Sequence, residues 1–426
     1  MKRLAVLFSL LALLLGASAL VAQNAAPTSA DAWRADLQFL WQNIRNVHPD
    51  PFRSTPQADF ERMVSDLDTA IPELTDEQIV VRLFGIVAAL EDGHSYFWFT
   101  GNDYPFRYYP LLFYPFSDGV YLIGAAPAQA DLVGSKLVQI GDTSIDAVLE
   151  RLLALAPHDN DSSRLVTIPM LLSMTDALLG TGITADADQP AYHLERPDGE
   201  PVTINPAPVD FAAYRAAIPV AWRLPARAEP LALSRLDESF WWTYLEADRT
   251  FYVQYNAVVR RDEATGTTLG ALVDALDEAV TTLPLRRVIL DMRYNGGGDI
   301  NTALPLRDEI ARTPFFQQPG SLIVLTGRNT FSAAVVFSLW LEQSVDPVFI
   351  GEPTGGKPLM FENARRMTLP NSRLTVQIAT RARRDVDASD PRQAVEPDVR
   401  VDPSAAAYFA AADPVLAAAL AYSEVS

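Results

Sequence analysis

The chain has 426 residues, and its content of 49% hydrophobic and 20% charged residues is typical of a globular protein large enough for several cores. Acidic residues outnumber basic ones by 53 to 34. The net charge of −19 argues against nucleic acid as a partner and leaves room only for weak association with a membrane surface. The absence of cysteine excludes disulfides, a thiol nucleophile and thiolate metal sites. Its 4 histidines are scattered along the chain, so we expect neither a metal nor another cofactor.

Residues 1–22 predict a secretory signal peptide. Lys2 and Arg3 form its basic region, an apolar core covers 4–15, and small residues up to Ala22 offer a cleavage zone. An uncleaved membrane anchor is the alternative, but the apolar segment is short and polar residues follow it at once. We therefore expect an extracytoplasmic protein (periplasmic, cell-envelope or secreted) after cleavage.

Residues 30–95 predict a small N-terminal helical domain. Apolar residues recur at helical spacing in three segments, 31–47, 57–71 and 75–90. The third helix opens on a capping box, Thr75-Asp-Glu-Gln78, and Gly93 is the expected stop after it. His94 therefore falls in a loop at the end of this domain.

Residues 96–205 predict a β-rich domain. Its aromatic, proline-rich beginning, 96–116, favours β structure packed on the helices, with a ligand groove as the alternative. Short apolar runs and tight turns follow, and the stretch 134–146 in particular resembles a PDZ-like module. No convincing carboxylate-binding loop accompanies it, so peptide capture by this domain is not expected.

Residues 206–426 predict an α/β domain with a parallel sheet, because strand and helix patterns alternate after an Ala- and Pro-rich linker. Asn295-Gly-Gly-Gly298 follows the apolar strand 287–293, and Ser332 follows the strand 322–326. Sites in such sheets lie at the carboxyl ends of the strands. We therefore expect the glycine loop and the serine to contribute to one site.

Ser332 stands in the first turn of a predicted helix, where free N–H groups and the positive end of the helix dipole meet. A nucleophilic serine needs this place, because pre-aimed donors must meet the negative charge that it creates on a carbonyl oxygen. Gly297 or Gly298, together with Ala333, are the candidate donors of this oxyanion hole. The structural alternatives are helix capping by Ser332, a task that Thr330 can also perform, and a tight turn or phosphate cradle at the glycines.

Two residues are candidate general bases. Lys357 lies on a glycine-rich loop 25 residues after Ser332, and a lysine serves as a base when its surroundings lower its pKa. His94 is of the residue type that most often acts as a general base. The structural alternatives are a solvated surface lysine and a histidine that stabilises its own loop.

Four segments together resemble the tail-specific, or C-terminal processing, serine peptidases and their tricorn-core and interphotoreceptor retinoid-binding relatives. They are 90–95 (LEDGHS), 288–298, 330–334 (TFSAA) and 351–357 (GEPTGGK). The resemblance covers nearly all of the mature chain. It implies an α+β multidomain protein whose last domain has the ClpP/crotonase-like fold, with Ser332 as nucleophile.

The resemblance leaves the base open. Members of the family with a serine–lysine dyad imply Lys357, whereas the tricorn-like members imply His94. Three residues are candidates for an acid that orients His94: Glu352, Glu362 and Asp390. The atom within hydrogen-bond reach of the Ser332 hydroxyl decides between the two bases.

The sequence thus predicts a secreted serine endopeptidase that hydrolyses peptides or proteins through an acyl-enzyme. A non-catalytic relative that binds a hydrophobic ligand or a peptide is the main alternative. A crotonase-type acyl-CoA enzyme is a third, but acyl-CoA is intracellular and the predicted signal peptide argues against it.

Overall fold

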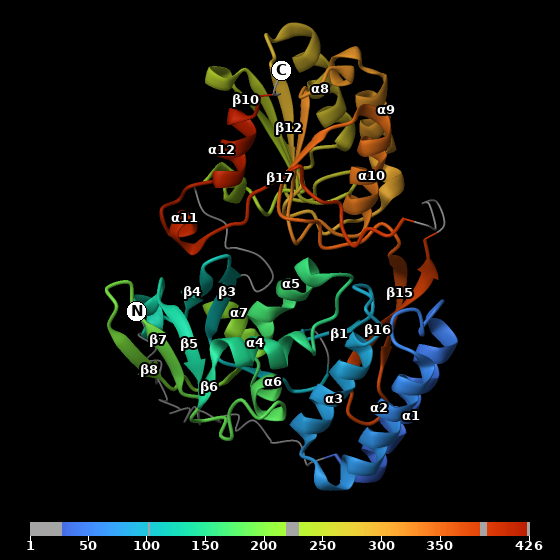
Figure 1. The fold of residues 1–426 in the computed structure, drawn as a ribbon, viewed down its shortest axis with the longest axis vertical. Coiled ribbons are helices and arrows are strands. Elements are labelled where there is room, and N and C mark those ends of the chain that lie inside the picture. The colour runs from blue at the N-terminus through green and yellow to red at the C-terminus, as the bar shows by residue number, and fades with distance from the viewer. Residues whose placement is uncertain (1–27, 101–102, 219–229, 384–389, 424–426) are drawn as a thin grey trace, which may run out of the picture.

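The structure is a computed structural model that describes residues 28–100, 103–218, 230–383 and 390–423. The predicted signal peptide lies outside the described residues. The chain forms two bodies, one above the other in Figure 1, and mixes helices and strands as predicted. Among the described residues, no helix has the length and apolar character needed to cross a membrane.

The upper body is built on one sheet of order β10-β11-β12-β13-β14-β17, in which all neighbours except β10 and β11 run parallel. Its strands are β10 (Phe240–Leu245), β11 (Thr250–Tyr255), β12 (Arg287–Asp291), β13 (Leu322–Thr326), β14 (Val348–Gly351) and β17 (Val399–Arg400). Helices cover both faces: α8 (Leu269–Thr282), α9 (Leu304–Arg312) and α10 (Ala333–Val345) on one, α12 (Pro414–Ala421) on the other.

The two faces of this sheet explain why its strands are apolar throughout. Successive side chains of a strand point to opposite faces. On β12, Val288 and Leu290 therefore join the core under α8, α9 and α10, whereas Ile289 joins the core under α12. Burial on both faces is what a continuous apolar run in a parallel sheet requires.

The lower body contains an antiparallel sheet of order β3-β4-β5-β7-β8 beside α4, α5 and α6. Its elements are β3 (Leu111–Phe116), β4 (Gly119–Ala125), β5 (Lys136–Ile140), β6 (Thr143–Ser144, paired with β5), β7 (Tyr192–Glu195), β8 (Pro201–Ile204), α4 (Ile145–Leu153), α5 (Asp161–Leu171) and α6 (Thr175–Gly180). The aromatic run 96–116 is mostly buried here. The PDZ-like character of this unit stays a prediction.

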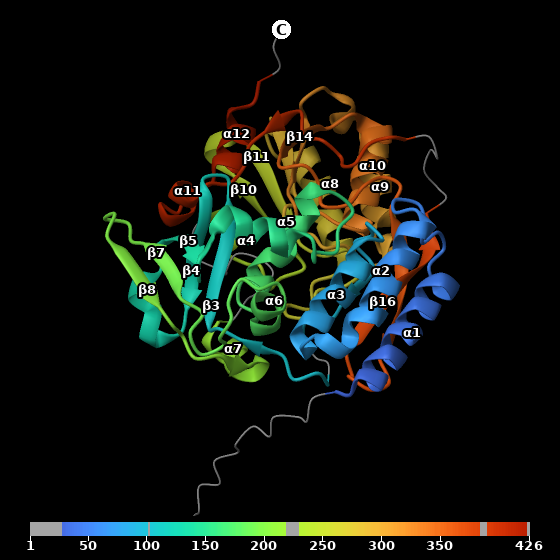
Figure 2. The ribbon, with the colours of Figure 1, turned by 60° about the horizontal axis from the view of Figure 1, so that its bottom comes forward.

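The rest of the lower body joins the two ends of the chain. Three N-terminal helices, α1 (Ala30–Val47), α2 (Gln57–Ala70) and α3 (Asp76–Ala88), lie beside a sheet of order β1-β16-β15 (Figure 2). Its strands are β1 (Tyr96–Phe97), β15 (Phe361–Thr368) and β16 (Thr375–Ala382). Helix α3 opens with the predicted capping box of Thr75 and Gln78.

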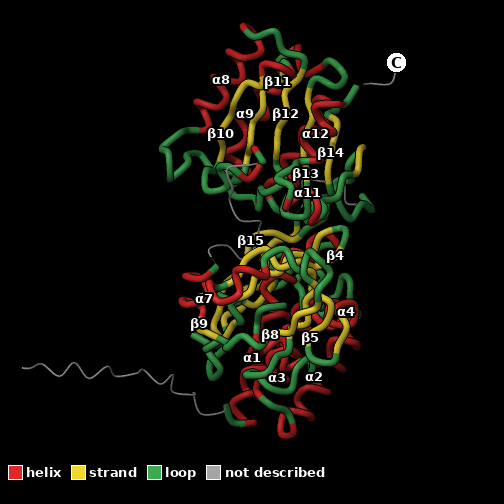
Figure 3. The backbone as a smooth tube through the Cα atoms, turned by 90° about the vertical axis from the view of Figure 1, so that its left-hand side faces the viewer, coloured by secondary structure: helices red, strands yellow, loops and turns green. Residues whose placement is uncertain are grey.

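The β15–β16 hairpin packs in the lower body because β16 pairs with β1. The strands before and after it in sequence, β14 and β17, belong to the sheet of the upper body. Figure 3 shows β15 at the junction of the two bodies. Other short pieces of 206–426 also pack below: β9 (Val209–Asp210) pairs with β2 (Arg107–Tyr108), α7 (Phe211–Ala217) follows β9, and α11 (Ala405–Phe409) adds to the lower core. The predicted unit 206–426 is thus shared between the bodies.

A buried carboxylate fastens the hairpin to the N-terminal helices. Asp36, on α1, is 0% exposed. Its oxygens accept hydrogen bonds from the backbone N–H groups of Asn371 (2.9 Å) and Ser372 (2.7 Å), in the turn between β15 and β16. Removal of this carboxylate leaves these donors unpaired, which is costly in free energy.

We expect Asp36→Ala to lower the free energy of unfolding by about 3 kcal/mol, because charged hydrogen bonds are lost and the buried N–H of Ser372 and the partly buried N–H of Asn371 remain. Urea denaturation followed by circular dichroism measures this change. The matched control is Asp66→Ala on the exposed face of α2, for which a change within about 0.5 kcal/mol is expected. Equal effects of the two variants would contradict the role of Asp36.

Candidate active site

Ser332 is held in a strained backbone conformation at the start of α10. Its φ of 53° and ψ of −122° lie in a region that residues other than glycine rarely adopt. Its side chain makes no capping hydrogen bond to the helix. Thr330 does not cap α10 either, since its hydroxyl donates to the carbonyl of Met292 and accepts from the N–H of Gly327. The Ser332 hydroxyl is therefore left for another partner, and strain of this kind clusters at functional sites.

That partner is His94. The Nε2 atom of His94 lies 3.0 Å from the Ser332 Oγ, although 238 residues separate the two in sequence. The imidazole also stacks on the ring of Phe331, with 4.6 Å between the ring centres. His94 comes from the loop after α3 in the lower body, so the pair spans the junction of the two bodies.

The loop of His94 is fixed by hydrogen bonds on both sides. The N–H of His94 donates to Asp92 Oδ1 at 2.9 Å, and its carbonyl accepts from Gln377 Nε2 at 2.9 Å. Next to it, the Ser95 hydroxyl donates to Asp92 Oδ2 and accepts from the N–H of Ala379. Strand β16 thus supports the loop from behind, which limits the positions that the imidazole can take.

Lys357 binds the same loop and not the serine. Its side chain is 7% exposed, and its Nζ donates to the carbonyl of Glu91 at 3.0 Å. Glu91 has a positive φ of 48° at the point where the chain turns from α3 towards His94. Of the two candidate bases, the structure brings His94 to the nucleophile and places Lys357 behind the histidine loop.

Two buried acids accompany these groups. Burial alone would raise the pKa of Asp92. The His48 Nε2, which lies 3.4 Å from Asp92 Oδ2, the hydrogen bond from the Ser95 hydroxyl and the nearby His94 outweigh burial and lower that pKa. Asp159, which precedes α5, accepts only one hydrogen bond among the described residues, from the N–H of Gly93. Burial and the neighbouring Asp92 carboxylate raise the pKa of Asp159 to about 6, against the opposing charges of Lys357 and His94.

Asp159 was not among the candidates from the sequence. Its Oδ1 accepts the N–H of Gly93 at 2.9 Å, one residue before His94. Its Oδ2 is buried and accepts no hydrogen bond within the described residues, and the Nδ1 of His94 is likewise buried without a partner there. A lone acid in a loop between two helices carries no spacing signal, which is why the sequence did not reveal it.

The three predicted acidic partners of His94 are engaged elsewhere. Each forms an ion pair with an arginine: Glu352 with Arg328 (2.5 Å), Glu362 with Arg381 (2.7 Å) and Asp390 with Arg392 (2.9 Å). No hydrogen bond joins any of them to His94 among the described residues. The Arg328–Glu352 pair is the most buried, and its Arg328 also donates to the carbonyl of Pro115 in the lower body.

The glycine loop approaches the nucleophile as predicted from its position after β12. A Cβ atom on Gly297 would lie 2.7 Å from the Cβ of Ser332, so this close approach requires glycine. The N–H of Gly297 donates to Asn295 Oδ1 at 2.9 Å and is already used. Within the described residues, no hydrogen bond uses the N–H of Gly298 or of Ala333. These two are the free candidate donors for an oxyanion.

The match to known families falls on this site. Residues 252–401 match the model of peptidase family S41, a range that includes the glycine loop, Ser332 and Lys357. These residues belong to peptidase family S41. The chain is therefore a serine-type peptidase, whose substrates are peptides or proteins, and the resemblance drawn from the motifs is confirmed at this level. His94 and Asp159 lie outside the matched residues.

Solved structures of CPAF share the fold of this chain at low sequence identity. Mature CPAF in complex with lactacystin has a TM-score of 0.62 and 13% identity, over 90% of this chain and 96% of that one. Another structure of mature CPAF has a TM-score of 0.61 and 13% identity, over 89% and 94%. The photosystem II D1 C-terminal processing protease has a TM-score of 0.39 and 16% identity, over 87% and 93%. Among curated proteins, none matches the chain in sequence.

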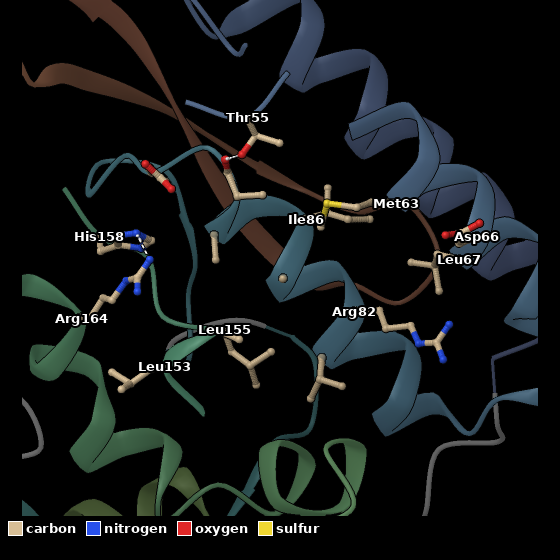
Figure 4. Close-up of a pocket in the computed structure, with 16 residues that line it drawn as sticks. Thr55, Met63, Asp66, Leu67, Arg82, Ile86, Leu153, Leu155, His158 and Arg164 are labelled. Atoms are coloured by element: carbon tan, nitrogen blue, oxygen red, sulfur yellow. Dashed lines mark hydrogen bonds between the residues drawn. The ribbon is translucent and has the colours of Figure 1, made fainter. Parts of the chain in front are cut away.

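Two cavities flank the histidine loop of this S41 peptidase. One, of about 550 Å³, borders Gly93, Gly297 and Phe331 and lies next to the Ser332–His94 pair. The other, of about 610 Å³, lies between α2 and α3 on one side and α4 and α5 on the other. Figure 4 shows His158 and Arg164 at one end of this second cavity and Met63 and Leu67 towards the other. In the part of the chain that the structure describes, no group of three or more acidic or histidine side chains is placed to hold a metal ion.

A carboxyl group whose pKa is higher in the folded protein than in the unfolded chain holds its proton more tightly when folded. Asp159 therefore favours the folded state at low pH, and this contribution is lost as the pH rises from about 4 to above about 6. The matched variant is Asp159→Asn, which keeps an acceptor for Gly93 but does not titrate.

We expect the free energy of unfolding of the wild type, relative to Asp159→Asn, to fall by about 3 kcal/mol between low pH and neutrality. Urea denaturation at a series of pH values measures it, with the exposed Asp66→Asn as control. A difference between wild type and Asp159→Asn that does not change with pH would show that Asp159 titrates normally.

Proposed function

We propose that this S41 peptidase is a serine endopeptidase in which Ser332 is the nucleophile and His94 the general base. The observation that carries the proposal is the 3.0 Å contact between the Ser332 Oγ and the His94 Nε2. A nucleophile and base within hydrogen-bond reach are the geometric requirement for such catalysis. We assign the upper body to the ClpP/crotonase-like type that the motifs imply.

In the first half of the reaction, the Ser332 Oγ attacks the carbonyl carbon of a peptide bond and its proton moves to the His94 Nε2. The negative charge that develops on the carbonyl oxygen is met by the free N–H groups of Gly298 and Ala333. His94 then returns the proton to the departing amine, and an ester between Ser332 and the acyl part of the substrate remains. Water, deprotonated by His94, hydrolyses this ester.

The imidazolium that forms in each step needs a compensating negative charge. Asp159 is the acid best placed to supply it, because it is buried beside the histidine loop and one of its oxygens is unused. Lys357 has a positioning role in this mechanism. It holds the carbonyl of Glu91, and its charge lowers the pKa of Asp159 and so favours the carboxylate.

The non-catalytic binder is less consistent with these observations. A protein that only binds a ligand has no need of a serine in a strained conformation whose hydroxyl meets an imidazole. The basic and apolar pattern of residues 1–22 further supports action outside the cytoplasm, after signal-peptide cleavage. N-terminal sequencing of the mature protein tests that location.

We expect Ser332→Ala to keep the fold and to lower kcat by at least about a thousandfold, because the nucleophile is lost while binding and oxyanion donors remain. Hydrolysis of an unfolded protein substrate such as casein, followed by gel electrophoresis, measures the activity. Circular dichroism controls for folding. Undiminished hydrolysis by the purified variant would contradict Ser332 as nucleophile.

The variants His94→Ala and Lys357→Met distinguish the two bases. We expect His94→Ala to lower kcat by about a thousandfold or more. We expect Lys357→Met to keep measurable activity and to move the acidic limb of the pH–rate profile to higher pH, since a charge that lowers the pKa of Asp159 is removed. The matched control is Lys136→Met on β5.

The reverse result, with Lys357→Met inactive at every pH and His94→Ala active, would make the lysine the base. An unchanged acidic limb in Lys357→Met would separate Lys357 from Asp159 and contradict the positioning role.

A further inference from the structure

The cavity of about 550 Å³ opens at the catalytic pair. Three of its lining residues are direct neighbours of the reacting groups: Gly93 precedes His94, Phe331 precedes Ser332, and Gly297 precedes the free donor Gly298. A side chain attached to the carbonyl under attack begins within this ring of residues. The volume is in the usual range for ligand sites, about 300–1,000 Å³.

Aromatic side chains dominate the walls of this cavity. They come from both bodies and are Tyr96, Trp98, Phe99, Tyr294 and Phe331. Pro157 and Val166, the latter on α5, add further apolar surface. Aromatic rings pack well against other aromatic rings, both through buried area and through edge-to-face contacts.

Asn256 also borders the cavity, but its amide is held by the protein. Its Nδ2 donates to the carbonyls of Glu238 (2.9 Å) and Arg235 (3.3 Å), and its Oδ1 is buried out of reach of an occupant.

The one arginine that borders the cavity does not favour an anionic occupant. Arg328 is 5% exposed and its guanidinium is taken by Glu352 and by the carbonyl of Pro115. A carboxylate placed in the cavity would lose its hydration without gaining a free cation. The walls therefore select an uncharged, large, aromatic group.

We propose that this cavity binds the side chain of the residue that supplies the scissile carbonyl, and that it selects an aromatic side chain. The ring of tryptophan, tyrosine or phenylalanine packs among the aromatic walls. Alanine leaves the cavity unfilled. The inference rests on the proposed function, since it assigns a side-chain preference to the same Ser332 site.

The first test compares peptides that differ only at that residue, with tryptophan, tyrosine, phenylalanine or alanine. We expect kcat/KM for each of the three aromatic residues to exceed that for alanine by about a hundredfold. Mass spectrometry of digested casein identifies the new termini, and tryptophan, tyrosine and phenylalanine are expected at the new C-termini. Equal rates for alanine and tyrosine, or aromatic residues confined to the new N-termini, would overturn the proposal.

The second test fills the cavity from its wall. Val166→Trp is expected to lower the ratio of kcat/KM for the tyrosine peptide to kcat/KM for the alanine peptide by more than about tenfold. The matched control is Leu153→Trp, which fills the other cavity and is expected to leave this ratio unchanged. Equal loss for both peptides in Val166→Trp, with Leu153→Trp unaffected, would count against a side-chain site.

The outcomes separate this proposal from the proposed function. Cleavage of casein that Ser332→Ala abolishes, but that shows no aromatic preference, leaves the peptidase assignment standing and overturns the assignment of the cavity. Cleavage that persists in Ser332→Ala overturns both.

Discussion

One contact, between the imidazole of His94 and the hydroxyl of Ser332, connects the two bodies of this S41 peptidase chemically. Each partner is immobilised by its own body. A strained backbone at the start of α10 presents the serine, and Asp92, Ser95 and β16 hold the histidine loop. A hydrogen bond is lost when its atoms move by a fraction of their separation. The relative position of the two bodies is therefore a requirement of the chemistry.

The buried charged side chains beside the loop of His94 differ in how many hydrogen-bonding and charged partners they have. Asp92 has His48, Ser95 and a backbone N–H, and Lys357 has the carbonyl of Glu91. Asp159 has one backbone N–H and an unused oxygen, and its raised pKa follows from that deficit. Buried charge without full compensation destabilises a fold, and such groups persist where they serve a function. The least satisfied acid of the cluster lies beside the loop of His94, the group that we propose becomes positively charged in catalysis.

The parts of the fold that depend on local patterns could be predicted from the sequence. The capping box at Thr75 and the parallel strands around Ser332 each depend on a short stretch of residues. The nucleophile and the glycine loop could be found because each follows a buried strand. The choice between His94 and Lys357 could not be made, because it depends on how two bodies meet. Asp159 carried no signal at all, since its role comes only from its neighbours in space.

The β15–β16 hairpin is synthesised after the other segments that form the site, yet it holds one of them in place. A ribosome releases the N-terminal helices and the loop of His94 first, whereas Gln377 and Ala379, which brace that loop, emerge late. Contacts between such distant parts of a sequence form slowly, because a long loop must close before they are made. An unfinished chain that ends before this hairpin already contains the serine but has no braced histidine. On the mechanism that we propose, the hairpin is therefore as necessary for cutting peptides as the serine and the histidine are.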